Sequence, residues 1–455
     1  MSNLTLDWSH AWPSFSAPAK RPGVSCPSGG GRNAVAAAEP YAARLERSLP
    51  ELPFLTLPFA EQLSGQLDGH TEFLHSFRHM LVLGIGGSAL GARALQKAFF
   101  PAQDRPGHNG PWLWIADNVD PDGFEALLEK LPPEETLVAV ISKSGGTIET
   151  VSQYLLVLPW LQKRLPGTWQ EHLFVVTDAQ AGFLRDEADH HFLRSLPVPE
   201  GLGGRYSVLS AVGLVPAAFL GVDWKALLRG ACDVGRPLAA EPAALAEHSA
   251  WRLAMWASHL AFSGKSQLIF FCYAPAWAAF GPWFAQLWAE SLGKDGRGTM
   301  PVPAVGVTDQ HSLLQMFLGG PLDKGCLFLS APAPRGPVLE PQAAPWSWLT
   351  GKSLGDILEA ETLATRMSLV QRGVPLVHVA APDCGEYAAG RLIMLLEATT
   401  VFTGWISGIN PLDQPAVEEG KKLARGRLGA PGSESDAERL TRFTERDAKA
   451  DISRA

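Results

Sequence analysis

The sequence contains little cysteine, and its first residues do not have the pattern of an export signal. Its five cysteines are odd in number, are scattered along 455 residues and never occur with C-x-x-C spacing. This pattern argues against a disulfide framework and against a zinc site, and it is typical of a reducing compartment. The first residues, MSNLTLDWSHAWPSFS, lack an apolar core and a cleavage-site pattern, so we expect no signal peptide and a cytoplasmic location.

Charge is also sparse, and it is not concentrated in a basic patch. Charged residues make up 18% of the chain, the formal net charge is −8, and no dense basic run suggests a nucleic-acid partner. Residues 266–289 carry no charge and are long enough to span a bilayer, but Pro275, Gly281 and Pro282 interrupt them. We therefore expect a buried strand and helix there, and no membrane partner.

What the chain does contain is a regular alternation of apolar runs and helical stretches. Apolar runs such as LVLGIG, TLVAVIS and HLFVVTD are separated by helical patterns, among them one over residues 147–165. A second series of the same kind begins near residue 240. Near-continuous apolar strands joined by helices indicate parallel sheets buried on both faces. The predicted fold is α/β, with two doubly wound domains, each a mainly parallel sheet flanked by helices.

We expect four segments along the chain, two of them large domains. Hydrophobic residues make up 46% of the chain, enough for large buried cores. We expect an irregular or helical segment over 1–60, a first α/β domain over 61–235, a second over 236–430, and a polar tail over 431–455. The tail is either a solvated helix or disordered.

One strand-to-helix corner has the composition of a phosphate site. In LVAVISKSGGTIET (137–150), an apolar run ends in Ser142, Lys143 and Ser144, two glycines and Thr147. The first backbone N–H groups of a helix are unpaired and its dipole is positive there, while the hydroxyls and the lysine add donors and charge. The alternative is an ordinary corner with polar turn residues.

A second corner lies upstream, in HMLVLGIGGSALGARAL (79–95). Gly84, Gly86 and Ala89 fit a dinucleotide fingerprint, with Asp117 as the acidic residue for a ribose. That alternative leaves the other corner unexplained, and tight packing alone demands the same glycines. Two such corners in one sheet are more simply explained by one small phosphorylated ligand.

Four further segments complete a recognisable set. Arg205, Glu290 and Lys421 each have an ordinary structural explanation when taken singly, as a cap, a surface carboxylate and part of a solvated face. The segments are EGLGGRYSVLSAVG (200–213), AQLWAESLGKDGRG (285–298), VGVTDQHSLLQ (305–315) and GINPLDQPAVEEGKK (408–422). Together with the two corners, and in the same order, they resemble the motifs of the phosphoglucose isomerase family.

The resemblance implies two sugar-isomerase-type domains and a role for each motif residue. Glu290 would be the base that moves a proton between C2 and C1 of the sugar, and Arg205 would lie against the cis-enediol intermediate. His311 would open the ring, assisted by Lys421 on the ring-oxygen side. The residues expected to bind substrate are Gly87, Ser88, Ser142, Lys143, Ser144 and Thr147 at the phosphate, and Gln286 and Gln414 along the site.

The implied activity is the reversible interconversion of glucose 6-phosphate and fructose 6-phosphate in glycolysis and gluconeogenesis, without a metal or cofactor. The resemblance also implies a homodimer in which His311 reaches the partner's site. Two alternatives stay open. One is a non-catalytic sugar-phosphate-binding regulator on the same fold, and the other is a nicotinamide-dependent oxidoreductase that uses residues 84–89.

Overall fold

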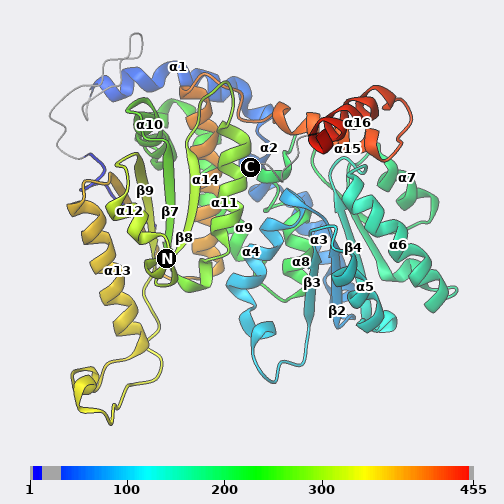
Figure 1. The fold of residues 1–455 in the computed structure, drawn as a ribbon, viewed down its shortest axis with the longest axis horizontal. Helices are drawn as coiled ribbons and strands as arrows, with labels where there is room; N and C mark the ends of the chain where they lie inside the picture. The colour runs from blue at the N-terminus through cyan, green and yellow to red at the C-terminus, as the bar shows by residue number, and fades with distance from the viewer. Residues whose placement is uncertain (1–3, 13–31, 450–455) are drawn as a thin grey trace.

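The computed structural model describes residues 4–12 and 32–449 and contains two five-stranded sheets (Figure 1). The first sheet is parallel throughout and has the order β3-β2-β4-β5-β6. Its strands are β2 (His79–Leu83), β3 (Trp112–Ala116), β4 (Thr136–Ser142), β5 (Leu173–Thr177) and β6 (Arg194–Pro197). The chain leaves β2 towards β3 and then returns to the other side of β2 to form β4. This reversal is the topological switch point of a doubly wound sheet.

The second sheet has the same winding, with the order β1-β10-β9-β7-β8. Its strands are β7 (Gln267–Tyr273), β8 (Met300–Val305), β9 (Lys324–Ser330), β10 (Leu376–Ala380) and β1 (Thr5–Asp7). Only β1 is antiparallel, and it pairs with β10 at the edge. No strand is predicted in this N-terminal segment, because three residues are too few to carry a period. The predicted α/β fold with two mainly parallel sheets is confirmed.

Helices cover both faces of the first sheet, which explains why its strands are apolar at consecutive positions. Met80 and Val82 face one core, while Leu81 and Leu83 face another. One side is covered by α3 (Glu61–His75), α4 (Leu90–Phe99) and α8 (Ala211–Phe219). The other side is covered by α5 (Pro121–Lys130), α6 (Ile148–Arg164) and α7 (Phe183–His190).

The uncharged run 266–289 forms β7 and most of a buried helix, as predicted. No helix in residues 4–12 and 32–449 is long and apolar enough to cross a membrane. The helices around the second sheet are α9 (Trp224–Ala240), α10 (Ser249–Phe262), α11 (Phe280–Leu292), α12 (Leu314–Gly319), α13 (Leu354–Gln371) and α14 (Glu386–Ile406). Two N-terminal helices, α1 (Arg32–Ser48) and α2 (Pro53–Thr56), lie along the same domain.

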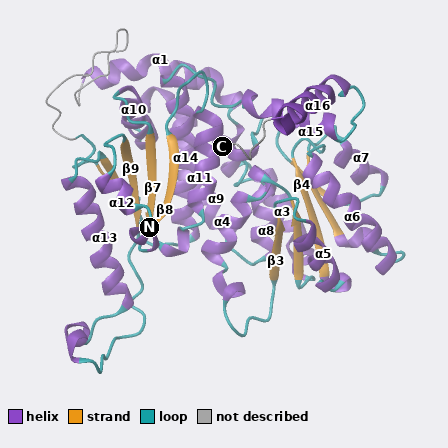
Figure 2. Cartoon of the chain, viewed as in Figure 1, coloured by secondary structure: helices purple, strands orange, loops and turns teal. Residues whose placement is uncertain are grey.

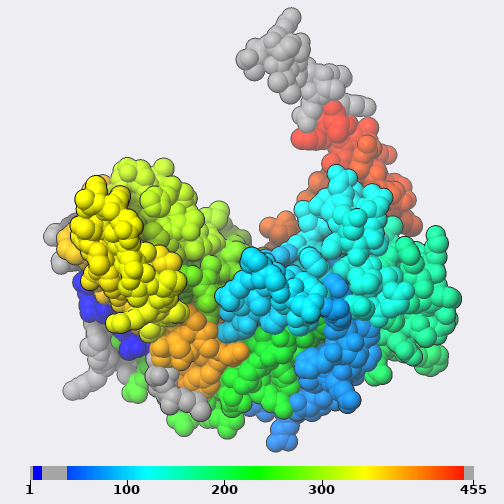
Figure 3. All heavy atoms as spheres, turned by 90° about the horizontal axis from the view of Figure 1, so that it is seen from below, coloured from blue at the N-terminus to red at the C-terminus, as the bar shows by residue number. Residues whose placement is uncertain are grey.

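The two sheets stand side by side, with helices α4, α9, α11 and α14 between them (Figure 2). The proline-rich stretch that follows β9 forms an arm, residues 331–353, that protrudes from the second domain (Figure 1). From below, this arm and the surface of the first domain border a broad hollow (Figure 3). At the C-terminus, α15 (Glu418–Arg427) and α16 (Glu434–Lys449) pack on each other beside the first domain.

Helix α14 is buried along most of its length, and it carries a carboxyl group into the core. Glu397 is fully buried, and neither of its oxygens has a hydrogen-bond partner among the described residues. Burial raises the pKa of Glu397 well above its usual value. A buried charge without a partner is costly, so the group is held in its protonated form.

Glu397 should make the protein less stable as the pH rises. The unfolded chain loses this proton near pH 4.3 while the folded chain keeps it, so the free energy of unfolding falls as the pH rises from there towards the raised pKa. Glu397→Gln removes this pH-dependent contribution to the free energy of unfolding. The melting temperature of the variant minus that of the parent protein should therefore increase from pH 4 to pH 8. The exposed Glu72→Gln is the matched control. A difference for Glu397→Gln that does not change with pH would contradict the assignment.

Candidate active site

Both glycine-containing corners lie at the switch point of the first sheet. Strands β2 and β4 are parallel neighbours, with Leu83 opposite Val140, so the segments that follow them leave the sheet side by side. Ligands of doubly wound sheets bind at this position, beyond the carboxyl ends of the strands. The structure therefore brings together the two segments that the sequence suggested as one phosphate site.

The corner after β4 is a tight loop in which Ser142 is buried, Ser144 is exposed and Thr147 is partly exposed. The hydroxyls of Ser142 and Thr147 are 3.0 Å apart, and the Gly146 N–H donates to Ser144 Oγ at 3.3 Å. Gly145 has φ +63°, a conformation that favours glycine. Thr147 precedes α6 without capping it through its side chain, so the first N–H groups of α6 have no side-chain partner from Thr147. This arrangement leaves backbone and hydroxyl donors for an anion.

Lys143 adds a positive charge at the same corner. Its side chain is half-buried, and burial lowers its pKa, with Arg205 acting in the same direction and Asp178 opposing it. A partly desolvated ammonium interacts with an anion more strongly than an exposed one does. The coupling to Arg205 indicates that the phosphate corner lies close to the rest of the predicted site.

The corner after β2 connects the two parts of the site through a glycine contact. A Cβ on Gly87 would lie 2.3 Å from the carbonyl carbon of Gly204, so the turn Gly86–Ser88 can touch the turn Gly204–Tyr206 only with glycine there. Ser88 lies within the first turn and Arg205 within the second. Glycine at position 87 is therefore required by this packing contact, in addition to its predicted role in binding phosphate.

Arg205 is buried, and each of its five N–H groups has an acceptor. Its Nε donates to Ser291 Oγ at 2.7 Å, and one terminal nitrogen donates to Glu290 at 3.2 Å and to Gln414 at 2.8 Å. The other terminal nitrogen donates to the carbonyls of Pro411 and Asp413, at 2.7 and 3.0 Å. A guanidinium has five donors in a fixed plane, so the side chain is held in one orientation.

Glu290 lies in the last turn of α11. One carboxylate oxygen accepts from Arg205, and the other accepts from Gln286 Nε2 at 3.0 Å, one helical turn earlier. The side chain of Glu290 is 31% exposed, so a ligand can reach it. A Cβ on Gly86 would lie 3.0 Å from Gln286 Nε2, which shows that Gln286 and Glu290 also border the corner after β2.

Two predicted residues lie apart from this cluster. His311 ends the short helix Thr308–His311 in the second domain and is exposed. Its side chain makes no hydrogen bond or ion pair with any described residue. Lys421 is exposed on α15, where it forms an ion pair with Glu418 at 2.7 Å. The structure of one chain thus assembles Arg205, Glu290, Gln286 and Gln414, and leaves the other two outside.

The residues that support Arg205 were not predicted from the sequence. Ser291 accepts from Arg205 and is 2.9 Å from the hydroxyl of Tyr206, while Lys294 forms an ion pair with Asp413 at 2.8 Å. Ser291 directly follows Glu290 in the sequence, and this position within the motif could have identified it as a candidate site residue. The ion pair joins residues far apart in the chain and has no local signal.

The dinucleotide alternative loses its acidic residue. Asp117 forms an ion pair with Arg93 at 2.8 Å and is already engaged within the first domain. Across residues 4–12 and 32–449, no group of three or more histidine, cysteine, aspartate or glutamate side chains is arranged to hold a metal ion.

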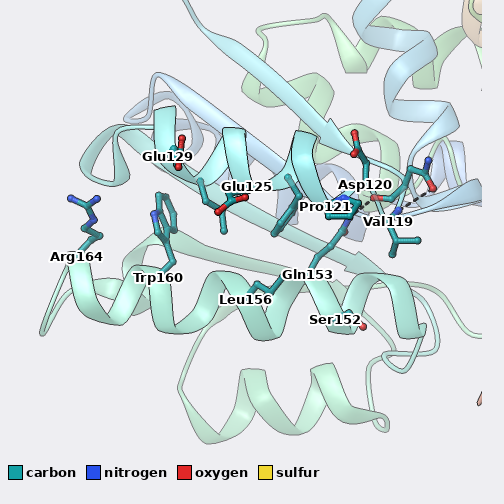
Figure 4. A pocket seen from close by; sticks show the side chains of 13 residues that line it. Val119, Asp120, Pro121, Glu125, Glu129, Ser152, Gln153, Leu156, Trp160 and Arg164 are labelled. Atoms are coloured by element: carbon teal, nitrogen blue, oxygen red, sulfur yellow. Dashed lines mark hydrogen bonds between the residues drawn. The ribbon is translucent and has the colours of Figure 1, made fainter. Parts of the chain in front are cut away.

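A separate groove lies between α5 and α6 (Figure 4). It has a volume of about 560 Å³ and is lined largely by apolar side chains, including Phe124, Leu156 and Trp160. Glu125, Glu129 and Arg164 lie at its rim. None of the predicted site residues lines this groove, and the sequence analysis did not anticipate it.

The chain is similar in sequence to known isomerases over most of its length. A family model described as phosphoglucose isomerase matches residues 57–310. A glucose-6-phosphate isomerase of Rubrobacter xylanophilus is 39% identical over 400 residues, which cover 86% of this chain and 89% of the relative. One from Thermus thermophilus is 38% identical over 386 residues, which cover 83% of this chain and 90% of the relative.

Solved structures agree with the fold. A crystal structure of a hypothetical protein from Thermus thermophilus matches with a TM-score of 0.77 and 34% identity, over 87% of this chain and 96% of that one. A glucose-6-phosphate isomerase from Chlamydia trachomatis matches with a TM-score of 0.68 and 24% identity, over 84% of this chain and 77% of that one. Fold and site together define a two-domain α/β protein of the sugar-isomerase type. More narrowly, the sequence matches place the chain in the phosphoglucose isomerase family.

The contact between Gly87 and Gly204 can be tested by two substitutions. In Gly87→Ala the new methyl group would meet the backbone of Gly204, which must move, and we expect a loss of stability on the order of 1–3 kcal/mol. In Gly204→Ala the methyl group would meet Gly87 Cα at 3.8 Å, an ordinary contact, and the melting temperature should change little. Equal melting temperatures for both variants would show that the contact is not tight.

Proposed function

We propose that the chain interconverts glucose 6-phosphate and fructose 6-phosphate by moving a proton between C2 and C1, as a step of glycolysis and gluconeogenesis. The observation that carries the proposal is the ion pair of Arg205 and Glu290 beside the two corners of the first sheet. A phosphate held at Ser142–Thr147 would leave the reacting carbons of the sugar near the carboxylate. Phosphate binding orients the substrate and takes no part in the chemistry.

Glu290 is the proposed base. A proton next to a carbonyl is weakly acidic, so its removal needs a placed base and a positive group where the enediolate charge develops. Glu290 takes the proton from one carbon and returns it to the other on the same face. Arg205 is fixed by its neighbours and lies against the carboxylate, so it stabilises the developing charge without having to reorient.

His311 and Lys421 have proposed roles in opening the sugar ring. A histidine donates and accepts protons near neutral pH, which suits this step. His311 lies outside the cluster of its own chain, and this position supports a homodimer in which it completes the site of the partner. Lys421 lies seven residues after Gln414, which binds Arg205, and it would assist at the ring oxygen after leaving Glu418.

The rival function is a sugar-phosphate-binding regulator on the same fold. Such a protein needs the phosphate corners but no placed base. The sequence contains Glu290, Arg205, His311 and Lys421 in addition to the two corners, and this favours catalysis. The sequence also supports a cytoplasmic location, as expected for a glycolytic enzyme.

Replacing the base should separate chemistry from binding. Glu290→Gln keeps the shape and the contact with Arg205 but cannot accept the proton, so kcat should fall by roughly 10² to 10⁴. Conversion of fructose 6-phosphate is followed through a coupled dehydrogenase after treatment with a chelator, and binding is followed by calorimetry. Near-normal turnover would exclude Glu290 as the base, and a parent protein that binds without turnover would favour the regulator.

Thr147→Val is the matched variant at the other end of the substrate. It removes one hydroxyl from the phosphate corner, a contact that is present in both the ground state and the transition state. We therefore expect KM to rise while kcat stays close to the parent value. If kcat fell instead, the phosphate contact would be specific to the transition state.

A mixture of two inactive variants tests whether His311 acts across a dimer. His311→Ala should slow the conversion of ring-closed sugar phosphate more than that of an open-chain analogue. When His311→Ala and Glu290→Gln chains are unfolded and refolded together, mixed dimers contain one intact site. Activity should return to about a quarter of the parent value, since half of the dimers are mixed and one of their two sites is complete. No recovery would place His311 in the site of its own chain or outside catalysis.

A further inference from the structure

A second cavity lies over the carboxyl end of the other sheet. It has a volume of about 270 Å³ and lies between α13, strands β9 and β10, and the start of the 331–353 arm. Its walls are mainly small or apolar, and its polar groups come from Ser330, Glu359, Thr362, Arg366 and His378. None of the residues assigned to the isomerase site lines it. We infer that this cavity binds a small oxyanion, a carboxylate or a phosphate, through Arg366 and Ser330.

The hydrogen bonds of His378 fix the direction in which Ser330 donates. Arg366 contacts His378 Nδ1, and because a guanidinium can only donate, Nδ1 must be the acceptor. The ring proton is therefore on Nε2, which donates to Ser330 Oγ at 2.8 Å. Burial and the charge of Arg366 lower the pKa of His378 to about 4, in keeping with a neutral ring.

The hydroxyl proton of Ser330 is then free to point into the cavity. In the hydrogen bond with His378 the serine oxygen is the acceptor, so the hydroxyl proton is not used there. Among the described residues, the hydroxyl of Ser330 makes no other hydrogen bond. This order of donors also excludes Ser330 as a nucleophile activated by His378, because the histidine holds no free lone pair towards the serine. The serine can serve as a hydrogen-bond donor to a ligand.

Two carboxylates lie near Arg366 without forming an ion pair with it. Glu359 lines the same cavity, and the pKa of Asp7 is lowered by its hydrogen bonds from Ser9 and also by the charges of His378 and Arg366. Within residues 4–12 and 32–449 Arg366 forms no ion pair, and its recorded contact is the neutral His378. Asp7 lies opposite His378 in the sheet, but its carboxylate accepts from the N–H and the hydroxyl of Ser9. A half-buried guanidinium with unused donors is suited to a planar or tetrahedral oxyanion.

The position in the fold supports a ligand site. The second sheet repeats the winding of the first, so β9 corresponds to β4, and Ser330 ends β9 as Ser142 ends β4. A cavity beyond the carboxyl ends of the strands is where doubly wound sheets bind ligands. In the second sheet the segment after Ser330 enters the arm and contains Pro332, which has no N–H group to donate. The donors for the anion come instead from Arg366.

Equilibrium dialysis of the full chain against two radiolabelled probes, inorganic phosphate and malonate, tests the site. Arg366→Gln should lose one equivalent of a probe per chain, or bind that equivalent at least about tenfold more weakly, since it removes charged hydrogen bonds. Arg366→Lys, which keeps the charge, should retain part of the binding. Thr147→Val weakens phosphate binding at the first sheet only and serves as the control for that corner.

The two probes distinguish the source of the anion. Loss of a phosphate equivalent in Arg366→Gln identifies a phosphate site, and loss of a malonate equivalent identifies a carboxylate site. If neither probe loses an equivalent, the proposal is wrong. Ser330→Ala should weaken the same equivalent without removing the arginine, and it decides the matter if Arg366→Gln does not fold. Isomerase turnover of these variants should stay at the parent level, because neither residue belongs to the isomerase site.

Discussion

The side chain of Arg205 is the point where three distant segments of the chain meet. Its N–H groups donate to two side chains at the end of α11, those of Glu290 and Ser291. They also donate to the loop before α15, at the carbonyls of residues 411 and 413 and at the side chain of Gln414. A guanidinium buried without acceptors would be costly, so each segment has to be in place for the others to be stable. The position of Glu290 follows from this constraint, because the carboxylate is one of the five acceptors.

A glycine contact makes that arrangement possible. Arg205 reaches the site because its turn packs directly against the turn that follows β2, and the backbone approach leaves no room for a side chain on Gly87. The same turn leaves β2 beside the phosphate corner of β4. One close contact therefore sets the distance between the predicted phosphate corner and Glu290, the proposed base, and catalysis by positioning requires such a fixed distance.

The two sheets share a winding but have different polar groups at their carboxyl ends. In the first sheet, hydroxyls, a lysine and the start of α6 follow β4, whereas in the second an arginine on α13 supplies the charge beside β9. The arm of residues 331–353 separates β9 from its helix, so the helix start cannot serve an anion there. A common topology thus offers two places for ligands, and the local sequence decides how each is built.

Local patterns in the sequence determined the fold class, and they singled out Arg205, Glu290, Gln286 and Gln414, which the structure brings together. Strands buried on both faces are apolar at consecutive positions, and helix limits near residues 147–165 lie within one residue of the observed Ile148–Arg164. Short-range order of this kind needs only neighbouring residues. The acceptors of Arg205 lie 85 to 209 residues away, Glu397 is buried by helices from several parts of the chain, and β1 joins an edge formed by β10. Only the tertiary structure decided these contacts, because packing between distant segments leaves no period in the sequence.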